Sequence, residues 1–230
     1  IAGVDFGNPP EGAAAEIRRL GRRFLPIKAD LGSIEPLQRI VDAVVAELGK
    51  IDILVNNAGT IRRAPALEFT EKDWDDVLTI NSKTVFFLSQ AAGRDMMKRR
   101  YGKIINVSSD SFLSGVPGFI HYISSKGAVV GFTRGLAREL GESGIRVNTL
   151  CPTFIRTPLT AKNPYGMPFL MDVADFAPRA ADAILAGARY RTIPWQMGVV
   201  TGVLRLLPRW LFDRVTSRRK QKPRAVASPP

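Results

Sequence analysis

Three side chains in the middle of the sequence have types and spacing suited to moving a proton to or from an oxygen atom. Tyr122 and Lys126 are four residues apart, and Ser109 precedes the tyrosine by thirteen residues. If a helix begins at Tyr122, the phenol and the ammonium group lie one turn apart on one face. An adjacent cation lowers the pKa of a tyrosine, which is otherwise ~10. A serine hydroxyl can hold a substrate oxygen nearby, so the set suits interconversion of an alcohol and a carbonyl.

A tyrosine and a lysine at this spacing are usually just a surface pair on a helix, so the pattern needs support from elsewhere in the chain. Two further motifs provide it: Asp52-Ile-Leu-Val-Asn-Asn-Ala-Gly59, and Asn81 within Leu78-Thr-Ile-Asn-Ser-Lys83. Together and in this order, the motifs resemble those of the short-chain dehydrogenase/reductase family. The resemblance predicts an α/β fold with a doubly wound, Rossmann-like parallel sheet.

The resemblance also implies a role for each residue of the set. Tyr122 would be the acid/base, Ser109 would fix the substrate oxygen, and Asn81 would position a water that relays the proton onward. Lys126 would lower the pKa of the tyrosine and hold the nicotinamide ribose. The expected activity is that of an NAD-dependent oxidoreductase, in which the cofactor carries the hydride between nicotinamide and a secondary alcohol or ketone.

Length and composition agree with one sizeable core. The chain has 230 residues, 45% of them hydrophobic, and we expect a single domain over residues 1–216 followed by a basic disordered tail over 217–230. The single cysteine, Cys151, excludes an intrachain disulfide and is interpreted as a small core residue. We find neither a secretory signal nor an apolar run of membrane-spanning length, which favours a cytoplasmic protein.

Short apolar runs alternate with segments of helical period, as in repeated βαβ units. The runs predict strands at Ile1–Asp5, Arg23–Lys28, Ile51–Asn56, Lys103–Ser108 and Arg146–Cys151. Helices are predicted at Pro36–Leu48, Glu71–Arg99 and Tyr122–Leu140, with Gly49, Gly102 and Gly141 where they could stop.

Ligands of such a sheet bind at the carboxyl ends of its strands. Asp5 closes the first strand, where its carboxylate could accept hydrogen bonds from a ribose and repel a 2′-phosphate, which favours NAD over NADP. The alternative is a strand-end aspartate that caps the following turn. By resemblance, Asp30 and Leu31 hold the adenine ring.

The remaining cofactor contacts are also assigned by resemblance. Asn57, Ala58 and Gly59 form a turn in which a bulky side chain would block the cofactor. Pro152, the Ile155 backbone and the Thr157 hydroxyl are expected to grip the nicotinamide end.

Two features depart from the family pattern. The chain begins at what resembles the second strand, so the first strand and the Gly-rich turn, roughly thirty residues, are absent by comparison with the family. Either this is a truncated product or the true start lies upstream, and we expect such a chain to be poorly stable and to bind dinucleotide weakly. The second departure is Thr153, where the family usually has glycine, a change that is tolerable if the backbone φ is negative. A non-catalytic fragment or membrane-associated binding module that keeps the site residues is therefore the rival interpretation.

Within the family, the first half of the chain looks close to the 2-deoxy-D-gluconate 3-dehydrogenases, which implies a sugar-acid substrate. Arg62 and Arg63 could bind its carboxylate, or they could be a solvated pair. His121, the only histidine, cannot build a metal site alone and is predicted to line the cleft; no metal is expected. A homodimer or homotetramer built on the Glu71–Arg99 and Tyr122–Leu140 helices is implied.

The C-terminal third diverges from these relatives. We predict a helix at Asp182–Ala188, a strand at Arg191–Pro194, and an apolar segment at Trp195–Val215 that Pro208 should break. Residues 179–230 hold eleven lysines and arginines against two aspartates, or +9 of the chain's +12 net charge. Three interpretations stay open: a helix pair covering the cleft or a subunit interface, peripheral membrane contact through 195–215, and nucleic-acid binding, which no motif supports.

Overall fold

The computed structural model describes residues 1–7, 11–114, 117–161, 167–187, 192–211 and 214. The chain divides into two compact units, residues 1–150 and 151–230, which are treated separately below. The single domain expected over 1–216 stays a prediction, and the tail expected over 217–230 lies outside the described residues. None of the helices in the described ranges is both long enough and apolar enough to cross a membrane.

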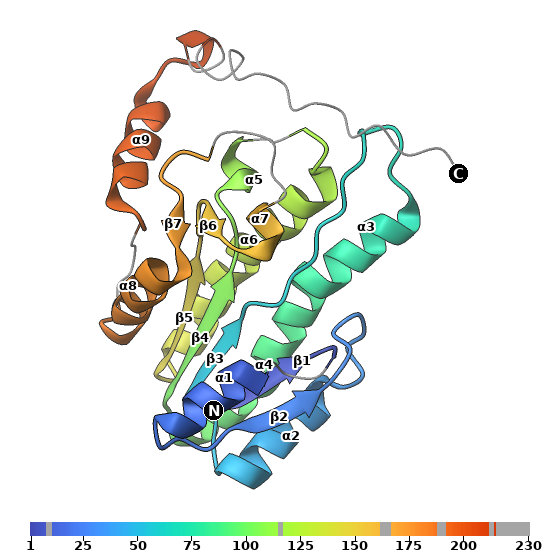
Figure 1. The fold of residues 1–230 in the computed structure, drawn as a ribbon, viewed down its shortest axis with the longest axis vertical. Coiled ribbons are helices and arrows are strands. Elements are labelled where there is room, and N and C mark those ends of the chain that lie inside the picture. Colours follow the sequence, from blue (N-terminus) through green and yellow to red (C-terminus); the bar gives the residue numbers. More distant parts are fainter. Residues whose placement is uncertain (8–10, 115–116, 162–166, 188–191, 212–213, 215–230) are drawn as a thin grey trace. The chain divides into compact units, whose positions relative to one another are not determined.

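The first unit alternates strands and helices (Figure 1). Its elements are β1 (Ala2–Asp5), α1 (Glu11–Arg19), β2 (Leu25–Lys28), α2 (Leu37–Leu48), β3 (Ile53–Asn56), α3 (Glu71–Leu78), the π-helix η1 (Thr79–Lys83), α4 (Thr84–Arg99), β4 (Gly102–Val107), α5 (Ser111–Ser114), α6 (Ile120–Gly141) and β5 (Ile145–Leu150). All five predicted strands of this unit are present, with boundaries shifted by one or two residues.

The strands form two parallel sheets. β1 pairs with β2, whereas β3, β4 and β5 form a second sheet in that order. In the described part of the chain, no strand joins β1 to β3. Because parallel strands point the same way, the carboxyl ends of β3, β4 and β5 meet at one edge, and the residues that follow them can form a site there.

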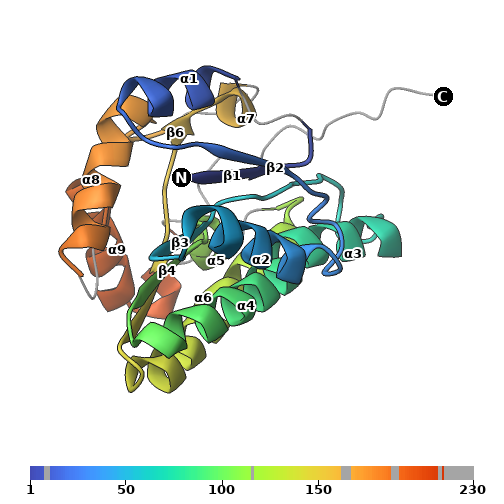
Figure 2. The ribbon, with the colours of Figure 1, turned by 90° about the horizontal axis from the view of Figure 1, so that it is seen from below.

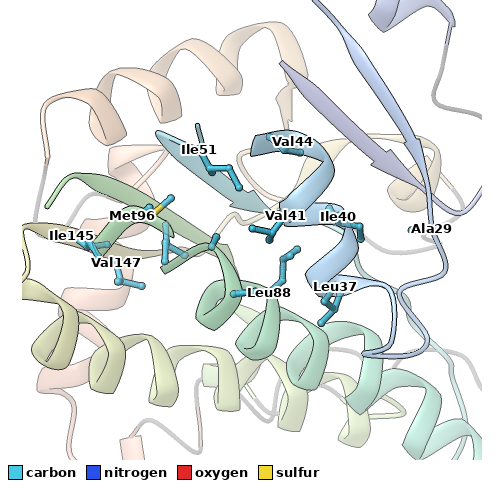
Figure 3. Close-up of a cluster of buried hydrophobic side chains, with 13 residues drawn as sticks. Ala29, Leu37, Ile40, Val41, Val44, Ile51, Leu88, Met96, Ile145 and Val147 are labelled. Carbon is cyan, nitrogen blue, oxygen red and sulfur yellow. The ribbon is translucent and has the colours of Figure 1, made fainter. Parts of the chain in front are cut away.

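One layer of helices, α2, α4 and α6, packs against these strands (Figure 2). Leu37, Ile40, Val41 and Val44 recur at helical intervals on α2 and are buried, so the predicted amphipathic face is confirmed. These side chains belong to one buried cluster with Leu88 of α4, and Figure 3 shows Leu37 and Val41 next to Leu88. The core therefore lies between this helical layer and the two sheets.

Two of the predicted helix ends need comment. Gly49 ends α2 as expected, with a left-handed φ of 86° and its N–H bonded to the Val45 carbonyl. The expectation that Gly102 ends α4 is wrong, because Arg100 takes the left-handed position at φ 51°. Gly102 instead begins β4 directly against Met96, where a Cβ atom would collide with the methionine side chain.

A chain of buried polar side chains joins β3, β4, α4 and α6. The Asn56 amide donates to Asn106 Oδ1 at 2.8 Å and to Ser89 Oγ at 3.0 Å. Asn106 Nδ2 donates to Thr133 Oγ1 at 2.9 Å, and Ser89 Oγ donates to the Val85 carbonyl. Each buried amide thus has partners, as burial in a low-dielectric interior requires.

The second unit contains β6 (Ile155–Arg156), α7 (Pro158–Ala161), β7 (Met171–Asp172), α8 (Val173–Leu185) and α9 (Trp195–Leu206). The helix predicted near Asp182 is the end of α8. The strand predicted at Arg191–Pro194 is wrong for its described part, since residues 192–194 lead through a cis Ile193–Pro194 bond into α9. Pro208 lies in the break between α9 and the helical turn that follows it, as expected.

The assignment of Cys151 to the core is also wrong. The residue is exposed, because it follows the last residue of β5 where the chain leaves the first unit.

Candidate active site

Tyr122 and Lys126 lie in the first two turns of α6, as their spacing predicts. The Lys126 ammonium nitrogen is 5.8 Å from the centre of the Tyr122 ring, and it donates a hydrogen bond of 2.8 Å to the Val107 carbonyl. Since Val107 is the last residue of β4, this bond fixes the lysine at the carboxyl edge of the sheet. Lys126 is only 4% exposed, so its charge acts in a poorly solvated place.

Ser109 follows β4 by two residues and forms a side-chain hydrogen bond with the Tyr122 phenol. Its hydroxyl also accepts hydrogen bonds from the Ser111 backbone N–H at 3.2 Å and the Ser111 hydroxyl at 2.9 Å. Those bonds hold the Ser109 side chain beside the phenol. The structure thus brings Ser109, Tyr122 and Lys126 together.

Asn81 is fully buried in η1 and connects three parts of the first unit. Its Oδ1 accepts from the Thr60 N–H at 2.8 Å, and its Nδ2 donates to the Thr60 carbonyl at 2.9 Å and to Ser125 Oγ at 3.1 Å. The amide therefore ties the turn after β3 to α6. Ser125 in turn donates to the Tyr122 carbonyl at 2.7 Å.

The turn Asn57-Ala58-Gly59 follows β3 and is exposed, as expected of a surface that must admit a ligand. A Cβ atom added to Gly59 would lie 3.3 Å from Asn81 Oδ1 and 3.6 Å from Lys126 Nζ. Gly59, Asn81 and Lys126 therefore surround one small space, which a side chain at position 59 would occupy. The predicted contact of Lys126 with the ribose of a nicotinamide dinucleotide stays a prediction.

The residues predicted to contact an adenosine lie at or just after the ends of β1 and β2, and two of them, Asp5 and Asp30, are exposed carboxylates. Asp5 Oδ1 accepts the Gly7 N–H at 2.8 Å, and Asp30 Oδ1 accepts the Gly32 N–H at 2.7 Å. Asp5 thus caps a turn, which was the alternative to its ribose role, and the ribose role stays a prediction. The Leu31 carbonyl accepts from Thr84 Oγ1 at 2.9 Å.

A hollow of about 470 Å³ opens beside Asp30. It is lined by Asp30, Ser33, Glu35, Pro36 and Arg39. The predicted contact of Asp30 and Leu31 with an adenine ring stays a prediction.

The three remaining predicted contacts belong to the second unit and are described within it. Pro152 is half-buried, and Ile155 begins β6. Thr157 stands before α7, where its hydroxyl lies 3.3 Å from the Thr160 hydroxyl, which donates to the Ile155 carbonyl at 2.6 Å. Their role toward a cofactor stays a prediction. Thr153 is not among the described residues with positive φ, so its replacement of glycine brings no left-handed strain.

Burial raises the pKa of the Tyr122 phenol. The hydrogen bond from Ser109 works in the opposite direction, and the charge of Asp110 adds to the rise. The expected lowering of this pKa is therefore not a property of the structure, because loss of solvation outweighs the favourable contacts. At neutral pH the phenol is protonated and ready to donate.

Next to the site, Arg62 and Arg63 differ in their surroundings. Arg62 Nε lies 3.7 Å from the Asp73 carboxylate, whereas the Arg63 guanidinium lies 5.1 Å from the centre of the Phe119 ring. Phe119 in turn packs against the Tyr122 ring at 6.3 Å between centroids. Arg63 is thus the arginine that this chain of contacts links to the phenol.

His121 is buried and does not line a cleft. Its side chain is 0% exposed and packs on Phe69 with 4.3 Å between ring centres, so the prediction that it lines a cleft is wrong. The reason is helical geometry: a residue adjacent to Tyr122 points about 100° away around α6. Within the described ranges, no group of three or more His, Cys, Asp and Glu side chains could hold a metal ion.

Sequence reasoning missed three contributors to the site. Ser125 and Lys126 follow Tyr122 by three and four residues, so all three lie on one face of the helix. This spacing is a signal that the sequence contains. The Val107 carbonyl and the Phe119 ring carried no such signal, because their roles depend on how β4 and the turn before α6 meet.

Comparison with known proteins assigns the family. The model of the short chain dehydrogenase family matches residues 5–166, which is well over half of the chain and includes Asn81, Ser109, Tyr122 and Lys126. The chain belongs to the short-chain dehydrogenase family. The predicted family and the α/β fold with parallel sheets are therefore confirmed.

Several curated members of the short-chain dehydrogenase family are similar to this chain. The 2-dehydro-3-deoxy-D-gluconate 5-dehydrogenase of Escherichia coli K12 is 46% identical over 158 residues, which is 68% of this chain and 62% of the relative. The D-threitol dehydrogenase of Mycolicibacterium smegmatis is 42% identical over 168 residues, covering 70% and 63%. The 3-oxoacyl-acyl-carrier-protein reductase of Thermotoga maritima is 44% identical over 130 residues, covering 56% and 53%.

The chain thus spans less than two thirds of the length of these short-chain dehydrogenases. The resemblance to sugar-acid dehydrogenases is confirmed, although the similar protein of Escherichia coli is a 2-dehydro-3-deoxy-D-gluconate 5-dehydrogenase and not a 2-deoxy-D-gluconate 3-dehydrogenase.

Proposed function

We propose that this chain carries the acid–base centre of an NAD(P)-dependent oxidoreductase that interconverts a secondary alcohol and a ketone. The observation that carries the proposal is the assembly of Ser109, Tyr122, Lys126 and Asn81 at the carboxyl edge of the β3–β4–β5 sheet. Family membership supports the same chemistry, since the similar proteins are named as dehydrogenases and reductases.

Each residue has a role that follows from its contacts. The Ser109 hydroxyl holds the substrate oxygen next to the Tyr122 phenol, which is protonated because burial raises its pKa. In the direction of reduction, Tyr122 donates its proton to the developing alkoxide, and the nearby Lys126 ammonium stabilises the resulting phenolate. Asn81 keeps the Thr60 turn and Ser125 in place. We also propose that Asn81 positions a water molecule that relays the proton onward. A bound nicotinamide dinucleotide supplies the hydride chemistry.

The first prediction replaces the proton donor. Tyr122→Phe removes the phenolic oxygen and keeps the ring that packs against Phe119. We expect kcat for ketone reduction to fall by roughly 10²–10⁴-fold, the usual contribution of a general acid, while folding and cofactor affinity stay near those of the parent. Tyr101→Phe, at a 51% exposed tyrosine of the same unit, is the matched control and should leave kcat unchanged. Equal kcat in both variants would contradict the assignment.

For the cofactor we propose NAD in preference to NADP. Asp5 is exposed at the end of β1, and its negative charge disfavours a 2′-phosphate there. Titration of the chain with NADH and with NADPH, followed by nicotinamide fluorescence, tests the preference. Asp5→Ser should reduce it by weakening NADH or strengthening NADPH. No binding of either cofactor at millimolar concentration would instead favour a chain that keeps the site residues without dinucleotide binding.

For the substrate we propose a sugar acid. The similar dehydrogenase of Escherichia coli is named for a sugar acid, and Arg63 provides a guanidinium within the group of contacts around Phe119 and Tyr122. A guanidinium can bind a carboxylate through two parallel hydrogen bonds. Arg62 lies beside Asp73 and is not part of this group of ring contacts, so Arg63 is the candidate that we propose.

The third prediction separates the two arginines. Arg63→Gln should raise KM for an acidic substrate such as 2-dehydro-3-deoxy-D-gluconate roughly tenfold or more, since a charge-assisted hydrogen bond is lost, and should leave KM for a neutral polyol unchanged. Arg62→Gln is the control, with a smaller effect expected. An equal rise of KM for acidic and neutral substrates would show that Arg63 acts through the fold and not through a carboxylate.

The assembly and location of the protein remain proposals as well. We propose a homo-oligomer of the kind implied for the family, formed through α4 and α6, and a cytoplasmic location. Sedimentation analysis of the purified chain measures the first of these directly.

A further inference from the structure

Helix α9 of the second unit exposes an apolar stripe. Trp195, Val199, Val203 and Leu206 recur at spacings of four, four and three, which places them on one side of the helix. Their exposed fractions are 69%, 54%, 54% and 85%, high values for such residues. We call these four side chains the α9 stripe; the helix itself is seen in Figure 1.

Some residues of α9 outside the stripe are less exposed. Gln196 and Met197 are partly buried. A Cβ atom added to Gly198 would lie 3.2 Å from the Thr192 side chain, so the helix approaches the segment that precedes it closely there. The α9 stripe is thus the exposed apolar side of this helix.

A second tryptophan continues the exposed apolar surface. After Pro208 the chain makes a further turn, with the Leu211 N–H bonded to the Pro208 carbonyl at 2.9 Å, and Trp210 is 68% exposed there. Tryptophan favours the boundary between water and lipid, because its ring is apolar and its N–H is polar. Two exposed tryptophans therefore bracket the aliphatic part of this surface.

The sequence from Trp195 onward carries mostly positive charge. From Trp195 to the last residue the sequence holds eight lysines and arginines and a single acidic residue, Asp213. Arg209 and Arg214 are exposed. A second copy of this chain is a poor occupant, since it would bring two such positive segments together. An anionic surface into which apolar side chains can enter matches both properties.

We propose that the α9 stripe, with Trp210 and the surrounding arginines, docks this protein on a membrane surface rich in anionic lipid. At 1.5 Å per residue, the twelve residues of α9 extend about 18 Å, less than the ~30 Å hydrocarbon core, so the helix lies parallel to the surface with the stripe inserted. This inference does not depend on the dehydrogenase activity proposed above.

The test is co-sedimentation of the full chain with vesicles. Vesicles of phosphatidylcholine with about 30 mol% phosphatidylserine should bind the protein at least roughly tenfold more tightly than vesicles of phosphatidylcholine alone, and high salt should weaken the binding. The Val199→Glu/Val203→Glu variant should lose this binding by roughly tenfold or more, because two charges enter the apolar stripe. Leu67→Glu, at a fully exposed leucine of the first unit, is the matched control and should bind as the parent does.

Tryptophan fluorescence tests the proposal independently, in case the Val199→Glu/Val203→Glu variant folds poorly. In a Trp74→Phe background, the two remaining tryptophans are Trp195 and Trp210, and their emission should shift to shorter wavelength on anionic vesicles. No shift, or equal vesicle binding by the parent and the stripe variant, would overturn the proposal. Binding that depends on charge but not on the stripe would point to a polyanion such as nucleic acid. Self-association that the variant abolishes without vesicles would point to a second copy, and either outcome also overturns it.

Discussion

The imidazole of His121 is buried beside the residue that we propose as the proton donor. Neither of its ring nitrogens has a hydrogen-bond partner among the described residues. Burial lowers the pKa of His121, with Asp73 opposing this change and Arg62 adding to it. A buried imidazole without a partner is stable only when it is uncharged, so its protonation must compete with folding.

This arrangement predicts an acid-sensitive fold. The unfolded chain binds a proton at His121 near pH 6.5, whereas the folded chain binds it only at lower pH. Above about pH 6.5, His121 is neutral in both states and does not reduce the free energy of unfolding. Below that pH the unfolded chain binds the proton first, so the free energy of unfolding falls until the pH reaches the lower pKa of the folded state. Because the chain has one histidine, this part of the pH dependence belongs to one side chain.

Urea unfolding of the parent and of His121→Phe measures the effect. The variant keeps an aromatic ring against Phe69 and should lose the decline in the free energy of unfolding just below pH 6.5. Carboxylates with ordinary pKa values near ~4 contribute to both proteins only at lower pH. Identical pH profiles for parent and variant would mean that His121 does not control this decline.

Much of the catalytic set could be predicted from sequence, because Tyr122 and Lys126 are close in the chain and one helix relates them. The state of the phenol could not. Whether Lys126 or burial governs the pKa of Tyr122 depends on solvent exposure, and the sequence contains no direct record of that.

At the level of elements, η1 is the main departure from the predicted helices. The segment from Glu71 to Arg99 was expected to be one helix, and the π-helical turn at Thr79–Lys83 divides it into α3 and α4. Such wide turns are rare and often occur at functional sites. Here the turn contains Asn81, and no periodicity of apolar residues signals it.

We predict that Asn81→Ala destabilises the first unit by about 1–3 kcal/mol, since it leaves the Thr60 backbone groups and Ser125 without their buried partner. The loss should be visible in urea unfolding and should be accompanied by lower kcat. Asn57→Ala, at an exposed asparagine, is the control for stability and should change the free energy of unfolding little. Equal stability of the two variants would rule out the connecting role of Asn81.

Within the first unit, the two sheets and the helical layer leave one side of β3 uncovered. Ile53 and Val55 are 43% and 53% exposed, whereas Leu54, which points the other way, packs against the core. In the described residues β3 pairs with β4 only, so its other edge has unpaired backbone groups. Apolar side chains beside an unpaired edge are a recognised risk for association.

Val55→Thr should therefore reduce aggregation without weakening the fold. Threonine keeps the branched shape that suits a strand, and its hydroxyl is exposed to water, so the free energy of unfolding should change by less than about 0.5 kcal/mol. Light scattering on warming should begin at a higher temperature. Leu54→Thr is the matched comparison on the opposite face and should destabilise the fold by about 1–3 kcal/mol. Unchanged scattering in Val55→Thr would exclude this edge as the origin of aggregation.

The order of strands and helices could be predicted because apolar periodicity and glycine signals are local in the sequence. The division into units 1–150 and 151–230 and the short strands β6 and β7 could not, since they depend on contacts between distant segments. Cys151 illustrates this limit. Cysteine is a residue type common in protein cores, but this one is exposed because it lies where the first unit ends.

The buried amides of Asn56 and Asn106 also have a consequence for how the chain folds. The two residues are direct partners in the β3–β4 ladder, and their side chains are bonded to each other. Were β3 to slip along β4 by two residues, its apolar residues would still face the same sides, and the hydrophobic pattern would not detect the error. The bond between the two amides would then be lost, and a buried polar group left without its partner costs about 1–3 kcal/mol. The Asn56–Asn106 pair thus specifies the register of β3 on β4, which the burial of apolar side chains alone would not specify.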